Sequence, residues 1–235
     1  MKKISVIIPA YNEERYIQKT LSALQVQTFD RNLIEIIVVN NASTDDTARL
    51  AREGGADAVI DEPQQGTNRA RQTGLEYASG DIVAFLDADC VPPPWWLEKI
   101  YEKLHENKES FVALAGSYKY TEDSSEPLYI FEQLYSWLVL PTLNSVVGKV
   151  FKKGGVIIGG NFAAFRETFK KVNGIDTSFT FFGDDASIAR TLGALGHVQF
   201  DPTLYVRTST RRFEREGLIK TNWEYAVNYF KVMMK

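Results

Sequence analysis

Cysteine and long apolar runs are both scarce in this chain of 235 residues. Its single cysteine, Cys90, permits no disulfide within the chain, which fits a reducing compartment. No stretch reaches the roughly 18 to 20 apolar residues that a membrane-spanning helix needs. The first apolar run, residues 4–8, is too short for a signal peptide and ends at Pro9, so it predicts a strand instead. We therefore expect a cytoplasmic protein.

Positive charge is not in excess either, because the formal net charge is −3. A chain with this balance offers no electrostatic case for nucleic acid as its main partner. Internal repeats, low-complexity linkers and a G-x-G-x-x-G turn after a strand are also absent, and the last absence disfavours a dehydrogenase. With 44% hydrophobic residues the chain can bury a sizeable core, and its length suits one compact domain.

Strand and helix signals alternate through the first half of the chain. Asn12 is placed to cap a first helix, and Ser43 with Asp46 resembles a capping box for a second helix that runs to Glu53. The predicted strands are 4–8, 34–39, 58–60 and 82–86, and further helices are predicted at 66–78 and 95–105. This alternation predicts an α/β fold with a mostly parallel sheet flanked by helices on both faces.

The second half is less regular. Strands are predicted at 111–115, 161–165, 198–200 and 204–206, with a long aromatic helical stretch at 128–147. A basic run that includes Arg207 and Arg211 follows the last strand. The chain ends on an amphipathic helix predicted over 217–235. This helix packs on its own domain or in a homodimer, or it lies in the membrane interface with the upstream arginines against anionic lipid. In the latter case the protein rests on the inner face of the cell membrane.

Two carboxylates one residue apart, Asp87 and Asp89, follow the apolar run 82–86. That run predicts a fully buried strand, and ligands in open α/β sheets bind at the carboxyl ends of such strands. A D-x-D there offers two hard oxygen ligands to Mg²⁺ or Mn²⁺, ions that usually bind beside a substrate's phosphates. The alternative is that the two carboxylates only cap the next helix.

Four polar segments fall at strand ends on one edge of the predicted sheet: 9–13, 40–41, 87–89 and 183–185. Through them the chain resembles the family 2 glycosyltransferases. The resemblance rests on six motifs in order, namely Ser5–Glu14, Val38–Asp45, Ala70–Gly74, Gly80–Asp89, Gly159–Arg166 and Gly183–Asp185. It implies a single-domain glycosyltransferase A-type fold, and a metal-dependent inverting transfer of a sugar from a nucleoside-diphosphate sugar to an acceptor hydroxyl.

The resemblance also implies a donor site around the D-x-D. Asp89 would hold Mn²⁺ or Mg²⁺ on the diphosphate, with Asp87 on the metal's water shell or the ribose and Ala88 between them. Arg71 would add positive charge or orient Asp87, unless it is a solvated helix charge. The metal would act as a Lewis acid on the leaving group.

At the nucleotide end, Tyr11 offers a ring to stack on the base, and Pro9 and Ala10 let the backbone approach it. Glu13 would accept from the ribose or open the first helix. Asn41 stands in Asn40-Asn41, where the family commonly has Asp-Asp. Its carbonyl can still accept the imide proton of uracil, so a UDP-sugar is favoured and a GDP-sugar stays open.

A second departure concerns the last strand, where many relatives place a metal-ligating histidine. Residues 206–209 contain none, so metal binding would rest on Asp89, substrate phosphates and water. On the acceptor side, Asp185 would be the general base and Asp184 an acceptor contact, standing where the family usually has Glu. Both also fit the start of the helix that follows. Trp95 would stack on an acceptor sugar or pack at its helix start.

We divide the chain into a nucleotide-sugar-binding half, 1–115, an acceptor-binding half, 116–216, and the C-terminal helix, 217–235. The expected acceptor is a glycan or a lipid-linked sugar in cell-surface polysaccharide or glycolipid assembly. One rival is a non-catalytic sugar-nucleotide-binding module. A sugar-phosphate nucleotidyltransferase is the other rival, but Pro9-Ala10-Tyr11-Asn12 is not the glycine-rich phosphate loop that it would carry after the first strand.

Overall fold

A seven-stranded mixed sheet forms the centre of the computed structural model, in the order β3-β2-β1-β4-β6-β5-β7. The strands are β1 (Ile4–Ala10), β2 (Ile34–Asn40), β3 (Ala58–Asp61), β4 (Ile82–Leu86), β5 (Ala113–Tyr120), β6 (Asn161–Phe165) and β7 (Val198–Thr208). The structure describes residues 2–106, 110–120, 135–142, 144, 155–179, 183–211, 217, 227 and 231–232.

Most neighbouring strands run parallel. β1 is parallel to β2 and to β4, β2 is parallel to β3, and β5 is parallel to β7. Only β6 is antiparallel to both of its neighbours, β4 and β5. The predicted α/β class with a mostly parallel sheet is therefore confirmed. Because β1, β2 and β4 point the same way, the polar segments that follow them meet at one edge of the sheet.

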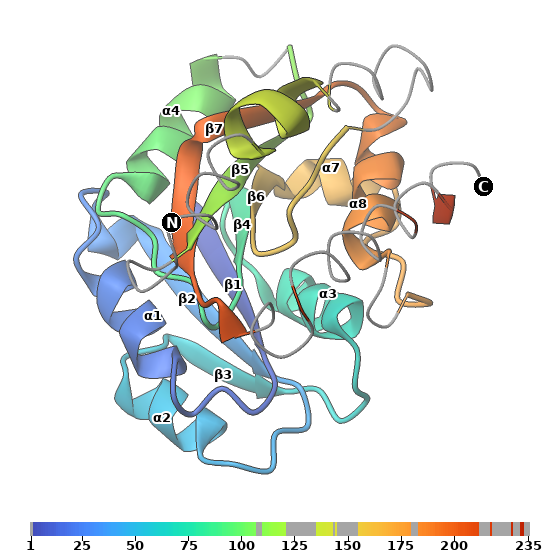
Figure 1. Ribbon diagram of the computed structural model, residues 1–235. Coiled ribbons are helices and arrows are strands. Elements are labelled where there is room, and N and C mark those ends of the chain that lie inside the picture. The colour runs from blue at the N-terminus through green and yellow to red at the C-terminus, as the bar shows by residue number, and fades with distance from the viewer. Residues whose placement is uncertain are drawn as a thin grey trace.

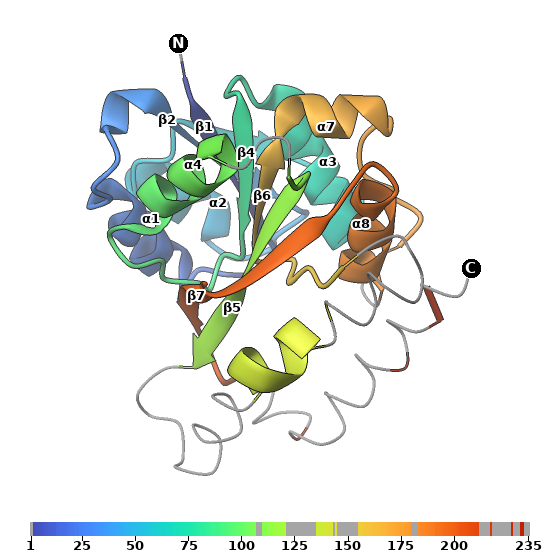
Figure 2. The ribbon, with the colours of Figure 1, turned by 90° about the horizontal axis from the view of Figure 1, so that it is seen from above.

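Helices cover both faces of the sheet (Figures 1 and 2). One face carries α1 (Ile17–Gln25), α2 (Thr47–Glu53) and α4 (Trp96–Glu106). The other carries α3 (Thr67–Tyr77), α7 (Arg166–Lys171) and α8 (Asp184–Gly193). Successive residues of β1 enter opposite cores, Val6 under α1 and Ile7 under α3, and both are fully buried. Burial on two faces explains why these strands read as continuous apolar runs.

The predicted helix caps at Asn12 and Ser43 are wrong. Asn12 has a φ of 54°, and α1 begins only at Ile17, after Tyr16. The Asn12 carboxamide instead accepts from Thr44 N (2.8 Å), and Ser43 Oγ accepts from Asn12 N (3.1 Å). These side chains join the loop after β1 to the loop after β2, so a tertiary contact replaced the local caps.

β7 joins two strands that the sequence predicts separately. Between them, residues 202–204 form an irregularity in β7 where the register with β5 shifts, because Gly116 pairs with Asp201 and Ser117 with Tyr205. Pro202 lies within this segment, and β7 is an edge strand, a position that tolerates proline. Strand β5 runs across the predicted 115/116 division, so the two halves share one sheet; the division itself stays a prediction.

Two predicted helices fall largely outside the described residues, those at 128–147 and 217–235. Within the first, Tyr135–Val139 forms a π-helical turn. None of the helices in the described ranges has both the length and the apolar character needed to cross a bilayer.

Asn161 joins three strands and a helix behind the functional edge. Its carbonyl accepts from Trp96 Nε1 (2.9 Å), and its amide donates to Ser117 O and Leu204 O (both 2.8 Å). Both Asn161 and Trp96 are fully buried. Each of the three partners would lose its hydrogen bond if this side chain were removed.

We expect Asn161→Ala to lower the free energy of unfolding by about 2–4 kcal/mol, because it leaves buried polar groups unsatisfied. Urea denaturation followed by circular dichroism measures this loss. Asn32→Ala, at an exposed asparagine, is the matched control and should change stability by less than about 0.5 kcal/mol. Equal stability of the two variants would contradict the role assigned to Asn161.

Candidate active site

The D-x-D sits in a turn that the strands on either side of it hold in place. Leu86, the last residue of β4, pairs with Asn161, which sets Asp87 beside Gly160, and Asp87 N donates to Gly160 O (3.4 Å). Cys90 N closes the turn on Asp87 O (3.0 Å). The Ala88 carbonyl accepts from Thr20 Oγ1 of α1 (2.7 Å). The two aspartates therefore lie on a rigid turn.

Arg71 of α3 is the centre of an acidic cluster. It is 2% exposed, and its guanidinium lies 2.9 Å from Asp184 Oδ2, 3.4 Å from Asp185 Oδ1 and 3.6 Å from Asp87 Oδ1. It also donates to Asn68 Oδ1 (3.3 Å). The predicted Arg71–Asp87 proximity is thus present, and Arg71 is not a solvated helix charge. The same guanidinium brings in Asp184 and Asp185 from the first turn of α8.

Two glycines let the backbone approach this cluster. A Cβ at Gly159 would lie 2.1 Å from Asp185 Oδ1 and 2.2 Å from Arg71 Nη2. One at Gly160 would lie 2.2 Å from Asp87 Oδ2. The backbone N–H of Gly159 favours the charged form of Asp185 and so opposes the rise in its pKa. Gly159 and Gly160, which open the fifth family motif, therefore form part of the wall of the cluster.

Tyr118 of β5 is a site residue that the sequence analysis missed. Its hydroxyl donates to Asp87 Oδ2 (2.8 Å) and accepts from Gly160 N (3.1 Å). Burial and the negative charge of Asp87 raise the pKa of Tyr118 well above its usual range, so the phenol stays a donor. No local pattern marks this tyrosine, since its partner Asp87 is 31 residues earlier in the chain.

Arg211 is the second missed residue. In the sequence it stands in a basic run, which faces anionic lipid in only one of the alternatives for the C-terminal helix, but its guanidinium lies in the site. Nη1 donates to Glu13 Oε2 (2.8 Å), and Nη2 contacts both Glu13 Oε1 and, at 3.2 Å, Asp89 Oδ2. Glu13, expected on a ribose or at the start of the first helix, is therefore paired with this arginine. Its role toward the ribose stays a prediction.

Negative charge is in excess around Arg71 and Arg211. Five carboxyl groups, on Glu13, Asp87, Asp89, Asp184 and Asp185, face the guanidinium groups of Arg71 and Arg211. Burial raises the pKa of Asp89 to about 7, against the attraction of Arg211. Burial and the neighbouring Asp184 raise the pKa of Asp185 to about 7, against Arg71. Burial likewise raises the pKa values of Asp184 and Glu13. A further cation bound near either arginine would offset this excess of negative charge.

The residues present fit a hard divalent metal ion at the D-x-D. Asp87, Asp89 and Cys90 offer ligand atoms that lie within 4.8 Å of one another. Burial raises the pKa of the Cys90 thiol well above its usual range. Hard divalent ions prefer oxygen to sulfur, so the two carboxylates are the fitting ligands. Two carboxylates in an acidic surplus suit Mn²⁺ or Mg²⁺. Neither of the chain's two histidines lies there, because His105 is in α4 and His197 precedes β7.

The nucleotide end of the site is less fully defined. Tyr11 is 47% exposed, and Ala10 is buried at the end of β1. The Asn41 side chain is buried and bonded to the loop before α3: Nδ2 donates to Glu62 O (3.1 Å) and Gln64 O (2.8 Å), and Oδ1 accepts from Gly66 N (2.8 Å). Asn41 therefore positions this loop. Contacts of Pro9, Ala10, Tyr11 and Asn41 with a base stay predictions.

The residues predicted for the acceptor differ in position. Asp184 is 13% exposed and bonded to Arg71 within the cluster. Trp95 packs edge-on against Tyr205 (5.3 Å between ring centroids), with Lys99 over its ring. These contacts fit the packing alternative for Trp95. Its acceptor role stays a prediction.

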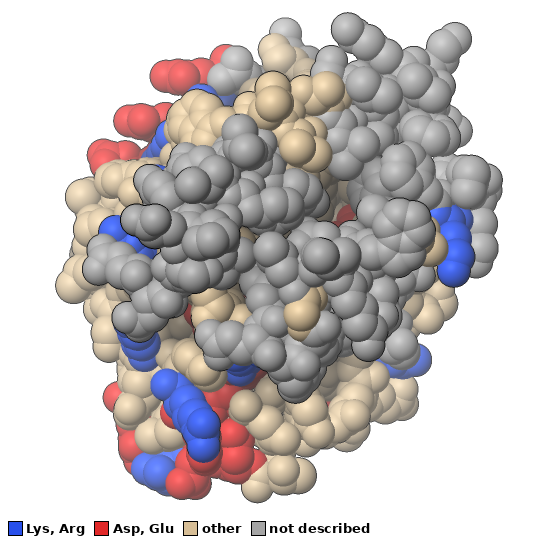
Figure 3. Space-filling model, in the orientation of Figure 1, with Lys and Arg blue, Asp and Glu red and all other residues tan. Residues whose placement is uncertain are grey.

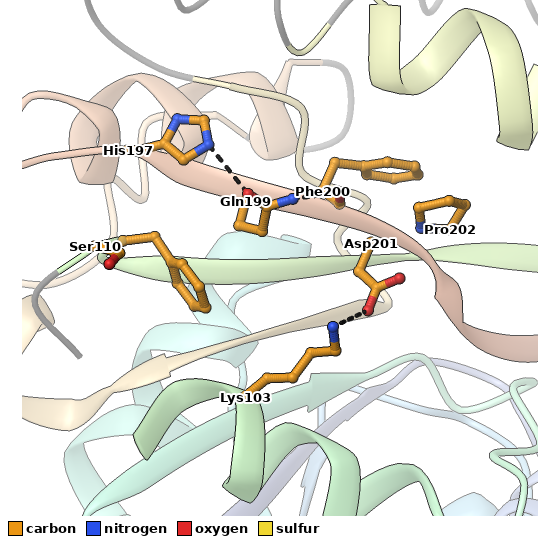
Figure 4. Close-up of a pocket in the computed structure, with 8 residues that line it drawn as sticks. Lys103, Ser110, His197, Gln199, Phe200, Asp201 and Pro202 are labelled. Atoms are coloured by element: carbon orange, nitrogen blue, oxygen red, sulfur yellow. Dashed lines mark hydrogen bonds and ion pairs between the residues drawn. The ribbon is translucent and has the colours of Figure 1, made fainter. Parts of the chain in front are cut away.

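A hollow of about 380 Å³ lies elsewhere, between the end of α4 and β7 (Figure 4). Lys103 and Asp201 form an ion pair of 3.0 Å across it, and His197 contacts Gln199 at 3.3 Å. Its lining includes no member of the acidic cluster. The hollow is therefore not part of the candidate active site.

Charged side chains are intermixed at the lower left of Figure 3, near α2 in the view of Figure 1. On α2, Arg49 lies 2.9 Å from both Asp46 and Glu53. On the face that Figure 3 shows, the described residues near α2 form no continuous basic patch.

The family model described as "Glycosyl transferase family 2" matches residues 5–173, which include the D-x-D and the Gly159-Gly160 pair. The chain belongs to glycosyl transferase family 2. The resemblance inferred from the six motifs is thereby confirmed.

Curated relatives of this family 2 chain include two proteins of Haloferax volcanii. Glycosyltransferase AglE is 46% identical over 101 residues, which are 41% of this chain and 33% of AglE. A glucosyl-dolichyl phosphate glucuronosyltransferase is 27% identical over 188 residues, which are 77% of this chain and 58% of that protein. The chain thus spans less than two thirds of the length of either relative.

Solved structures share the fold of this family 2 chain. Mannosyltransferase PcManGT from Pyrobaculum calidifontis, in complex with GDP-Man and Mn²⁺, has a TM-score of 0.67 at 23% identity, covering 87% of this chain and 56% of that one. Glucosyl-3-phosphoglycerate synthase from Mycobacterium tuberculosis, in complex with Mn²⁺, UDP and phosphoglyceric acid, has a TM-score of 0.66 at 20% identity, covering 99% and 78%. The predicted glycosyltransferase A-type fold is confirmed.

We expect Asp185→Asn to stabilise the protein at pH 8. A folded-state pKa of about 7, above the unfolded value, means that the folded state takes up protons between the two values. The stability from this group is complete below about pH 4 and is lost as the pH rises through 7. Asparagine removes that loss, so thermal unfolding at pH 8 should give a higher Tm for the variant.

Asp81→Asn, at an exposed aspartate before β4, is the control and should leave the Tm within a degree or two of wild type, roughly the effect of a surface change. A lower Tm of Asp185→Asn than of wild type at pH 8 would show that Arg71 stabilises the charged form of Asp185 more than burial disfavours it.

Proposed function

We propose that this chain is a metal-dependent inverting glycosyltransferase that moves a sugar from a nucleoside-diphosphate sugar to an acceptor hydroxyl. The observation that carries the proposal is the arrangement around Arg71. It joins Asp87, at the end of β4, to Asp184 and Asp185, at the start of α8. A donor-side carboxylate and a candidate base thus share one buried cation. Membership of family 2 and the fold support this reading.

The donor diphosphate would bind at the D-x-D. The metal, Mn²⁺ or Mg²⁺ held by Asp89 and Asp87, would supply Lewis-acid neutralisation of the leaving group's charge. Tyr118 and Arg71 fix the Asp87 carboxylate, and the Thr20–Ala88 bond fixes the turn between the two aspartates. A UDP-sugar is favoured, with a GDP-sugar as the alternative. One structural neighbour was solved in complex with UDP and another in complex with GDP-Man.

Asp185 would act as the general base. Its carboxylate takes the proton of the acceptor hydroxyl while that oxygen bonds to the anomeric carbon, and the bond from that carbon to the diphosphate oxygen breaks. One displacement of this kind inverts the configuration at the anomeric carbon. The side chain of Asp185 is 30% exposed, although Arg71 pairs with it and the Gly159 backbone lies against it on the protein side. A base so placed is both oriented and open to an acceptor.

The acceptor would be a hydroxyl of a glycan or of a lipid-linked sugar, in cell-surface polysaccharide or glycolipid assembly. Names of relatives support this class: one acts on a glucosyl-dolichyl phosphate, and another on poly(ribitol-phosphate). Asp184 and Trp95 are the proposed acceptor contacts. Peripheral membrane contact or a homodimer through 217–235 belongs to the same proposal, and that segment lies largely outside the described residues.

Calorimetric titration with UDP and GDP, each with and without Mn²⁺, tests the donor site. We expect one diphosphate to bind at least about tenfold more tightly with Mn²⁺, and Asp89→Asn to abolish the gain, because it removes a charged ligand. Asp81→Asn, the exposed control, should behave as wild type. If neither diphosphate binds under any condition, the proposed donor site is wrong.

Hydrolysis of UDP-glucose and GDP-mannose tests the base. We expect Asp185→Asn to lower kcat by about 10²–10⁴-fold without changing the affinity for the diphosphate, because only proton transfer is lost. For wild type, kcat/KM should rise with pH through about 7, the pKa of Asp185 set by burial and Asp184. Donor binding with no turnover, the same in both proteins, would favour a non-catalytic binding module.

A further inference from the structure

Arg211 connects the end of β7 to both loops that would face a donor. Val91 and Arg207 exchange backbone hydrogen bonds (2.7 and 2.9 Å), which fixes the end of β7 beside the residues after the D-x-D. Four residues after Arg207, the Arg211 guanidinium donates to both carboxylate oxygens of Glu13 and lies 3.2 Å from Asp89 Oδ2. Tyr16 lies under it, with its ring centroid 4.8 Å from Arg211 Cζ.

The exposures show how the three charged groups are layered. The side chains of Glu13 and Asp89 are 12% and 14% exposed, whereas that of Arg211 is 41% exposed. The guanidinium therefore covers the two carboxylates from the solvent side. Of the residues that the structure describes, Arg211 is the cation paired with Asp89, the carboxylate proposed as metal ligand.

A divalent ion and this guanidinium would compete for the Asp89 carboxylate. They carry charge of the same sign, and Asp89 Oδ2 is the oxygen that Arg211 already contacts. Arg211 nevertheless has two contacts with Glu13 that do not involve Asp89. It can leave Asp89 without leaving the site.

We propose that Arg211 is an internal competitor of the metal ion at Asp89, and that a nucleoside diphosphate relieves the competition. This inference rests on the proposed donor site. In the metal-free protein Arg211 is paired with Asp89. Metal binding moves the guanidinium off Asp89 while Glu13 retains it, and the diphosphate gives its freed donors an anionic partner, which a guanidinium binds well.

The competition makes metal and diphosphate binding cooperative beyond their direct contact. Metal alone must displace Arg211 from Asp89 with no replacement for the lost contact. Metal together with diphosphate supplies that replacement, so each raises the affinity for the other. Removing the guanidinium should therefore strengthen binding of the metal alone and weaken the cooperativity.

Electron paramagnetic resonance of free Mn²⁺ measures metal binding without any turnover. We expect Arg211→Gln to bind Mn²⁺ alone at least about fivefold more tightly than wild type, and UDP or GDP to raise its Mn²⁺ affinity by a smaller factor. Arg207→Gln is the matched control, because it removes the same charge four residues away on an exposed side chain. It should match wild type in both measurements.

Two results would overturn the role of Arg211: Mn²⁺ affinity of Arg211→Gln at or below that of wild type, or an equal gain in Arg207→Gln. If wild type binds Mn²⁺ and a diphosphate in the same experiment, the proposed donor site stands even when the role of Arg211 fails. If wild type binds neither, the donor site and the inference both fail. Thermal unfolding checks that each variant keeps its fold. Arg211→Lys keeps the positive charge but loses the forked guanidinium, and it should bind Mn²⁺ more weakly than Arg211→Gln.

Discussion

The buried guanidinium of Arg71 is the interaction on which the candidate site depends. Desolvation disfavours its charge, yet the three nearby carboxylates outweigh this and raise the pKa of Arg71 above its usual range. The dependence is mutual, because Asp87, Asp184 and Asp185 would otherwise hold like charges close together with little solvent between them. Since Asp87 follows β4 and the other two begin α8, one side chain of α3 joins the proposed donor side of the site to the proposed base.

Much of this could be predicted from the sequence, and the physical reason is burial. Strands β1, β2 and β4 are covered on both faces, so each appears in the sequence as a continuous apolar run. The end of each strand could therefore be predicted to within two residues. The D-x-D and Asp185 follow such signals or stand in a family motif. Local caps failed at Asn12 and Ser43, because the two loops bond to each other instead.

Tyr118 and Arg211 could not be predicted for a different reason. A tyrosine in a strand and an arginine in a basic run have the same local pattern whether they face solvent or a carboxylate. Their partners lie 31 residues away for Tyr118 and 198 residues away for Arg211. Only the order of strands, with β5 and β7 beyond β6, brings them to the D-x-D. The absence of a histidine from the last strand was visible in the sequence, but not that an arginine contacts Asp89.

The place of β6 also bears on how the chain folds during synthesis. β4 ends at residue 86, but its outer neighbour in the sheet is β6, which begins only at residue 161. Until that segment leaves the ribosome, the outer edge of β4 lacks its native partner, and an unpaired edge is a template for association with other chains. The four parallel strands can assemble early, whereas β5, β6 and β7 must join late through distant contacts, which slows folding. The nascent chain is therefore most prone to aggregation between those two events.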